Sequence, residues 1–199
     1  IMWEPLNSIP GLKFRYFAGD DDYQIRLDIF DKCREVEGIE WVMTLDEFKN
    51  DEKWNKNYDI HRNLVYVEVD EKPVGYIGYH WDSEQDGKII YFPFGMLIPS
   101  YRGRGIATLM LQYAENRCRE IAAEKHTGLD RRFRIWKKMK AVETVNFLLE
   151  KGYEIERYFF GMSRPIELPL GEHPLPPGIE IRPVEPSHYR AIWNSSDEA

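Results

Sequence analysis

Residues 102–107 read Arg-Gly-Arg-Gly-Ile-Ala and lie in the most informative segment of the chain. Two glycines flank Arg104, so the backbone can approach a ligand closely. A long helix is expected to follow, because apolar residues recur at helical spacing from Ile106 to Ile121. The free N–H groups at the start of a helix attract phosphate. The stretch therefore predicts an anion-binding loop at a helix N-terminus.

Two familiar phosphate loops do not match this stretch. The Walker A pattern requires Gly-Lys followed by Ser or Thr, and the dinucleotide fingerprint requires a third glycine where Thr108 stands. The glycines alone also fit an ordinary turn before a core helix. The flanking sequence is needed to distinguish an anion-binding loop from an ordinary turn.

The flanking sequence predicts an α/β (α+β) domain with the order βααβββαβαβ. Alternating apolar positions indicate strands at residues 12–17, 64–70, 73–81, 89–98, 132–137 and 153–164. Helices are expected at about residues 20–37, 44–57 and 143–151, in addition to the long one from Ile106. Thr44 and Glu47 form a capping box for the second helix.

This arrangement resembles the GNAT superfamily of acyl-coenzyme A dependent N-acyltransferases over residues 10–164. The superfamily signature is R/Q-x-x-G-x-G/A, and Arg102, Gly105 and Ala107 match it. The segment from Phe147 to Tyr153 is similar to the family's helix that ends before its last strands. The resemblance implies a mixed, largely antiparallel sheet of about six to seven strands flanked by four helices.

The same resemblance implies acetyl-CoA as cosubstrate and no metal. In the family, the loop amides hold the pyrophosphate and the preceding strand holds the pantetheine arm. These roles fall on the following residues: Leu97, Ile98, Arg102, Gly103, Arg104, Gly105, Ile106 and Ala107. A diphosphate at a helix N-terminus gains from the helix dipole and from charge-assisted hydrogen bonds.

The catalytic residues are less clear than the cofactor loop. Many GNAT enzymes place an acidic tyrosine four residues before the glycine that closes the last helix, and that position here is Leu148. The family's frequent asparagine is replaced by Ala141. Glu68 and His80 are candidates for the base that deprotonates the amine. The competing interpretation of both is an exposed or structural side chain.

The composition restricts the partners. The chain has 34 acidic and 27 basic residues and a net charge of −7, which argues against nucleic acid and anionic membranes and favours a cationic substrate. Cys33 and Cys118 fall on apolar sides of expected helices, which indicates free thiols in a reducing, cytoplasmic setting. No stretch is apolar enough to span a membrane. A homodimer is left open.

Two other patterns have alternative interpretations. Residues 131–140 alternate basic and aromatic or apolar side chains, which fits nucleic acid but also one strand with charges on one face. A group of aromatic residues fits either an acceptor pocket or core packing: Trp41, Trp54, Tyr58, Tyr79, Trp81, Tyr91, Phe92 and Phe94.

The C-terminal part of the chain repeats its start. Residues 1–164 are expected to form the GNAT domain and residues 165–178 a proline-rich linker. Residues 177–182 then match residues 10–15 in type, so residues 179–199 are expected to begin a truncated second GNAT-like domain. Two unrelated strand starts would give the same short match.

Two functions from different classes follow. The first is transfer of an acetyl or acyl group from acetyl-CoA to a small-molecule or protein amine through direct attack in a ternary complex. The second is a weak or silent coenzyme A binding or scaffold domain, with activity in the second copy. Leu148 and Ala141 favour the second, and the intact loop favours a working cofactor site.

Overall fold

The computed structural model describes residues 9–169, 171 and 173–197. The chain divides into two compact units, Ile1–Glu154 and Ile155–Ala199, and each is described by itself. All the strands of the described residues lie in the first unit.

The first unit is built on a mixed sheet whose strands follow the chain order β1-β2-β3-β4-β5. The strands are β1 Leu12–Tyr16, β2 Leu64–Val69, β3 Lys72–Ser83, β4 Ile89–Leu97 and β5 Arg131–Phe133. The first three pairings are antiparallel, while β5 runs parallel to β4. The parallel pairing is possible because the long helix between β4 and β5 returns the chain to the same end of the sheet.

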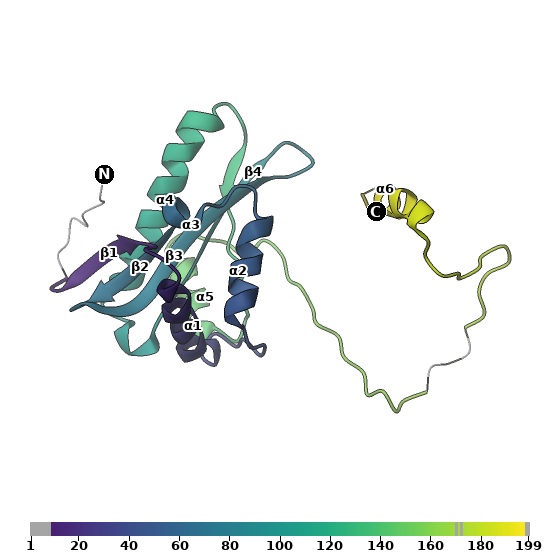
Figure 1. Cartoon of the computed structure of the whole chain (residues 1–199), viewed down its shortest axis with the longest axis horizontal. Coiled ribbons are helices and arrows are strands. Elements are labelled where there is room, and N and C mark those ends of the chain that lie inside the picture. Colours follow the sequence, from purple (N-terminus) through teal and green to yellow (C-terminus); the bar gives the residue numbers. More distant parts are fainter. Residues whose placement is uncertain (1–8, 170, 172, 198–199) are drawn as a thin grey trace. The chain divides into compact units, whose positions relative to one another are not determined.

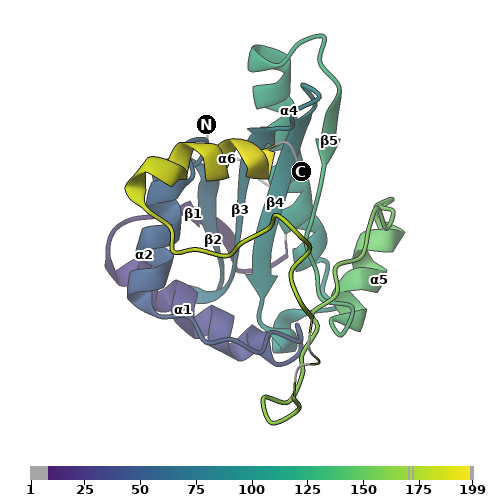
Figure 2. The same cartoon turned by 90° about the vertical axis from the view of Figure 1, so that its right-hand side faces the viewer.

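Helices cover both faces of this sheet (Figure 1). They are α1 Asp21–Arg34, α2 Leu45–Trp54, α3 Ile60–Asn63, α4 Ile106–Lys125 and α5 Val142–Glu150. In Figure 2, α1 and α2 lie in front of the sheet and α4 lies behind it. Strand side chains alternate between the two faces, so each helix layer receives its own apolar set.

Two apolar clusters follow from this alternation. On one face, Tyr66 and Tyr76 pack with Ile29 and Cys33 of α1. On the other face, β2, β3 and β4 pack against α4, whose contribution includes Ile106 and other buried residues. The α4 stripe is therefore core.

The capping box of the second helix is confirmed. The Thr44 hydroxyl accepts a hydrogen bond from the Glu47 N–H, and the Glu47 carboxylate accepts one from the Thr44 N–H at 2.7 Å. The short helix α3 was not expected, although Asp59 caps it by accepting from the His61 N–H.

The expected strand at 153–164 is wrong, so the sheet has five strands in the described residues rather than six or seven. A strand exists only through hydrogen bonds to a neighbouring strand, and an alternating sequence cannot show that an edge is available. Large side chains such as Phe160 and Met162 are almost fully exposed. The strand expected at 132–137 is also shorter and ends at Phe133.

The second unit contains one α-helix within the described residues, α6 Tyr189–Asp197, preceded by a 3₁₀ turn at Pro186–His188. Residues 177–182, which match residues 10–15 in type, do not form a strand. None of the helices in the described residues combines the length and the hydropathy that a membrane crossing requires.

Gly95 of β4 lies close to the backbone of β3, and this close packing gives a first prediction. A Cβ at Gly95 would lie 2.4 Å from the Tyr76 carbonyl oxygen, which is backbone and cannot move aside cheaply. Gly95→Ala should lower the free energy of unfolding by about 1–3 kcal/mol, measured by urea denaturation. Gly161→Ala is the control, because nothing lies within 4 Å of its added Cβ. Equal stability of the two variants would contradict this packing.

Candidate functional site

A gap opens between β4 and β5 after a short parallel ladder. Ile89 to Tyr91 pair with Arg131 to Phe133, and the Arg134 N–H then donates to the Tyr91 carbonyl at 2.8 Å. The next bond of a parallel ladder would be donated by residue 93, which is a proline and has no N–H. β4 continues to Leu97, while β5 ends at Phe133.

The edge of β4 along this gap presents free backbone N–H groups. The Ile98 N–H donates to the Val74 carbonyl at 2.9 Å, so the alternating residues Gly95 and Leu97 direct their N–H groups away from β3, toward the gap. Ile98 is fully engaged, since its carbonyl accepts from the Tyr101 N–H at 2.9 Å. Of the two strand residues singled out from the sequence, Leu97 can therefore donate to a ligand and Ile98 cannot.

The glycine loop follows directly and ends as the start of α4. Gly103 and Gly105 have φ angles of 72° and 82°, which favour glycine, and Gly105 is the residue before the first helical turn. Within the described part of the chain, the N–H groups of residues 103–108 have no backbone acceptor, and the first such bond runs from Leu109 to Gly105. Six consecutive N–H groups are therefore available at a helix N-terminus.

The side chains of this loop contribute less than its backbone. Ile106 is buried in the core and Ala107 packs against it, so both offer only their amides. The Arg104 guanidinium donates to the Ser100 carbonyl at 3.0 Å and lies over the Tyr101 ring.

Arg102 points inward rather than toward solvent. Its Nη2 donates to Glu37 Oε1 at 2.7 Å, and its Nε donates to the Leu97 carbonyl at 3.3 Å. A second carboxylate, that of Glu143, lies 3.3 Å from Nη1. The sequence suggested Arg102 as added charge for a phosphate, and the structure places that charge against two glutamates.

The two candidate bases are not brought together. Glu68 pairs in register with Pro73 on β3, and His80 lies seven residues farther along the same strand, which is about 23 Å in an extended chain. They can serve only as alternatives.

Glu68 is held in an ion-pair cluster near the edge of the sheet. Its carboxylate accepts from Arg15 Nε at 2.6 Å, and Arg15 also donates two bonds to the buried Asp22. Burial raises the pKa of Asp22, but the Arg15 hydrogen bond and the Ala18 N–H outweigh it, so the net pKa is lowered. The Glu68 carboxylate is therefore already bonded to a cation of the protein.

His80 has the properties of a free base. It lies opposite Phe92 of β4, its ring centroid is 4.8 Å from that ring, and its Nδ1 is buried with no hydrogen-bond partner in the described residues. Burial lowers the pKa of His80, and Asp82 only partly opposes this. A neutral imidazole near pH 7 keeps a lone pair that can accept a proton.

A family model agrees with this geometry. The model described as "Acetyltransferase (GNAT) family" matches residues 27–134, which contain β2 to β5, the loop and α4. The chain belongs to the GNAT acetyltransferase family.

Solved structures share this GNAT fold at low sequence identity. A GCN5-related N-acetyltransferase from Sphaerobacter thermophilus has a TM-score of 0.70 at 18% identity, covering 94% of this chain and 58% of its own. A predicted acetyltransferase from Clostridium acetobutylicum, solved with acetyl-CoA, has 0.53 at 17%, covering 76% and 96%.

An aminoglycoside acetyltransferase from an uncultured soil metagenomic sample has a TM-score of 0.54 at 11% identity, covering 79% of this chain and 97% of its own. No curated protein matches the chain at a significant level. This chain spans less than two thirds of the length of the Sphaerobacter protein.

The missing tyrosine of this GNAT chain is not replaced by Tyr153. The Tyr153 hydroxyl donates to Glu115 of α4 at 2.9 Å, so it is engaged away from the gap. Burial and the nearby Glu115 raise its pKa, which keeps the hydroxyl protonated. Leu148 itself, in α5, carries no acidic proton.

The basic run at 131–140 is largely paired with acids. Ion pairs join Arg132 to Asp130, Arg134 to Glu84, Lys137 to Glu37 and Lys140 to Glu40. These pairs remove most of the positive field that a nucleic acid would need.

The aromatic group is divided between the two faces of the sheet. Tyr79 and Tyr91 lie in the core beneath α4, whereas Tyr58 and Phe94 pack on the α1 side. Trp41 is half exposed. The side chain of Trp54 lies outside the described residues. The group is therefore mostly core, and only its α1-side members can border an acceptor.

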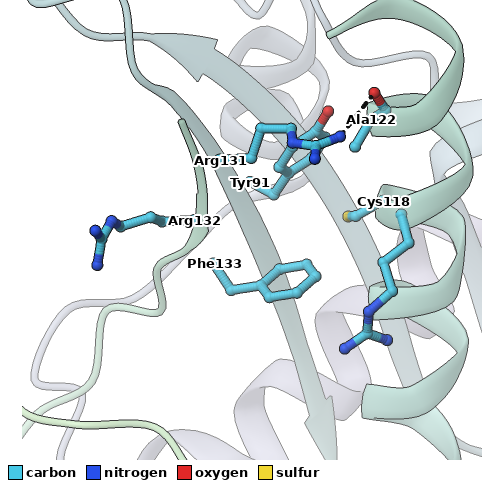
Figure 3. Close-up of a pocket in the computed structure, with 7 residues that line it drawn as sticks. Tyr91, Cys118, Ala122, Arg131, Arg132 and Phe133 are labelled. Carbon is cyan, nitrogen blue, oxygen red and sulfur yellow. Dashed lines mark hydrogen bonds between the residues drawn. The ribbon is translucent and has the colours of Figure 1, made fainter. Parts of the chain in front are cut away.

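A cavity of about 340 Å³ lies elsewhere, between α4 and β5 (Figure 3). Its lining includes Tyr91, Cys118, Ala122, Arg131, Arg132 and Phe133. The Phe133 ring points toward α4, and Arg131 donates to the Ala122 carbonyl at 3.2 Å. Cys118 lies thirteen residues along from Gly105, about 18 Å or more on a helix. This cavity is therefore separate from the cofactor loop.

Both cysteines are free and buried. Burial raises the pKa of Cys33 to about 11 and that of Cys118 to about 12, so both are thiols near neutral pH. In the described residues, no three or more His, Cys, Asp or Glu side chains are grouped to hold a metal ion.

The environment of His80 gives a second prediction. Because burial disfavours the imidazolium, His80 should titrate below the ordinary histidine pKa of about 6.5, as followed by NMR of the ring protons. Its contribution to stability should fall as pH drops below about 6.5, since the unfolded chain then binds the proton more readily. A titration midpoint above about 6.5 would contradict the buried, unpartnered ring.

Proposed function

We propose that this chain transfers an acetyl group from acetyl-CoA to a primary amine by direct attack in a ternary complex. One observation carries the proposal: the free N–H groups of residues 103–108 continue the line of free N–H groups on the β4 edge. The loop amides suit a diphosphate, and the N–H of Leu97 suits an amide of a pantetheine arm.

The orientation of the cofactor follows from this line. With the diphosphate at the loop, the arm runs back along residues 97 to 93, about 13 Å of strand, toward the point where β5 separates. The thioester then lies near Phe92 and Phe94. His80 is opposite Phe92 on the neighbouring strand, on the α1 face of the sheet.

The chemistry assigns a role to each of these groups. An alkylammonium with a pKa near about 10 must lose its proton before attack, and neutral His80 accepts it directly or through water. The amine nitrogen bonds to the carbonyl carbon, and the N–H of Gly95, the free β4 donor nearer to Phe92 and Phe94, stabilises the oxyanion. The C–S bond then breaks. The nitrogen releases its second proton to water, and the thiolate, with a pKa of about 8.5, takes a proton from water, because Leu148 provides none.

The acceptor we propose is a cationic small-molecule or protein amine in the cytoplasm. The net charge of −7 favours such a substrate. α1 and α2, which cover the face bearing His80, begin with acidic residues: Asp21 and Asp22 in α1, Asp46 and Glu47 in α2. The fold similarity to an aminoglycoside acetyltransferase is consistent with a polycationic acceptor.

A second candidate is a coenzyme A binding or scaffold domain whose activity resides in a further GNAT-like domain beginning at residues 179–199. Leu148 favours it, because the usual acid is missing. The repeat of residues 10–15 at 177–182 and the greater length of the Sphaerobacter relative also support it.

The cofactor loop gives the third prediction. Gly105→Asp should weaken coenzyme A binding by more than about tenfold in calorimetry, because it places a side chain and a negative charge where the diphosphate lies. Gly128→Asp is a matched control, since its φ of 81° imposes the same backbone strain at the other end of α4. Equal affinities of the two variants would move the site away from this loop.

The proposed base gives the fourth prediction. His80→Gln should lower kcat by about 10²-fold or more with little change in coenzyme A affinity, in an assay of thiol release with a panel of amines. The acid limb of the wild-type profile should fall through a pKa below about 6.5, because protonation removes the lone pair.

His61→Gln, at an exposed histidine, is the control for this variant. An active His80→Gln variant would remove His80 as the base. A wild-type chain that binds coenzyme A but is silent with every amine would favour the scaffold candidate.

A further inference from the structure

Glu37 is a buried carboxylate close to the cofactor gap. It follows α1, its N–H donates to the Cys33 carbonyl at 3.0 Å, and it is only 4% exposed. Figure 2 shows α1 and α5 on either side of the carboxyl end of β4. Glu37 is thus placed where the wall formed by β4 and the wall formed by the segment after β5 come together.

The carboxylate joins these two walls. On the β4 side, Oε1 accepts from Arg102 Nη2 at 2.7 Å, and the same guanidinium holds the Leu97 carbonyl. On the other side, Oε1 accepts from the Thr144 hydroxyl of α5 at 2.7 Å, and Oε2 from Lys137 Nζ at 3.1 Å. Without this group, the ion pair of Arg102 with the exposed Glu143 would be what remains, within the described residues, to join the glycine loop to α5 by charge.

The charges of this cluster are nearly balanced. Burial raises the pKa of Glu37, but Lys137, Thr144 and Arg102 together hold it below its ordinary value, so the carboxylate is ionised. A buried anion beside an anion-binding loop would repel phosphate if it were unpaired. Here two cations neutralise it, and the guanidinium that bonds it is the first residue of the loop.

We propose that Glu37 is a positioning residue for coenzyme A: it fixes the glycine loop, through Arg102, at a set distance from the wall formed by Lys137 and Thr144. This inference rests on the proposed function. Charge alone would predict the opposite effect of losing Glu37, because removal of an anion near a diphosphate should strengthen binding. The sign of the change therefore separates a positioning role from simple electrostatics.

The fifth prediction tests this sign with Glu37→Gln, which keeps the size and removes the charge. Its dissociation constant for coenzyme A should rise by about tenfold in calorimetry, because the loop loses its register with the opposite wall. In the amine assay, the KM for acetyl-CoA should rise, whereas the KM for the amine should not.

Glu40→Gln is the control. Glu40 is an exposed glutamate that pairs at 2.8 Å with Lys140, which lies after β5 in the same segment as Lys137. It should leave the dissociation constant within about twofold of the wild type. Thr144→Val supplies a milder variant in case Glu37→Gln does not fold. It keeps both charges and removes one bond to the α5 wall, and it should weaken binding by about threefold.

The outcomes are distinguishable. A folded Glu37→Gln variant that binds coenzyme A as well as the wild type, or better, would overturn the positioning role while leaving the proposed function intact. If only Thr144→Val folds, unchanged affinity in that variant overturns it. A wild-type chain that binds no coenzyme A would overturn both.

Discussion

Pro93 ends the pairing of β4 with β5, and the arrangement of the site depends on that end. A proline inside a strand is tolerated only where its nitrogen has no ladder bond to donate, and position 93 faces away from β3. The antiparallel pairing with β3 therefore continues to Leu97, while the parallel pairing stops at Tyr91. The result is a strand with one satisfied edge and one free edge, which is rare in a sheet interior and costly unless a ligand or water binds there.

The glycine loop extends this free edge into a helix N-terminus. α4 is held by apolar contacts along most of its length, so its first turn has a fixed position relative to β4. Because Gly105 has no side chain to cap the helix, the N–H groups remain available. The same loop makes little use of its arginines for an external anion, because Arg102 and Arg104 already have partners in the protein.

Ion pairs between residues far apart in the sequence link the elements of this acidic protein. Arg15 joins β1, α1 and β2 through Asp22 and Glu68, and Glu37 joins the loop to the segment after β5. Partly buried ion pairs of this kind add little to the net free energy of folding. They fix the relative positions of the elements that they join, and removing one partner is costly because it leaves a buried charge unpaired. They also pair four of the six basic side chains of residues 131–140 with acidic ones.

Most elements of the first unit and the loop could be predicted from the sequence, because glycines, capping residues and helical periodicity act over a few residues. Thr44 with Glu47, and the stripe from Ile106, are local signals of this kind. The sequence did not determine the partners of Arg102 or the absence of a strand at 153–164, since both depend on residues far away in the chain. Glu37 lies 65 residues from Arg102 and 107 from Thr144. Only the tertiary structure could bring that carboxylate to the gap, because burial and charge pairing are set by the packing of whole helices against the sheet.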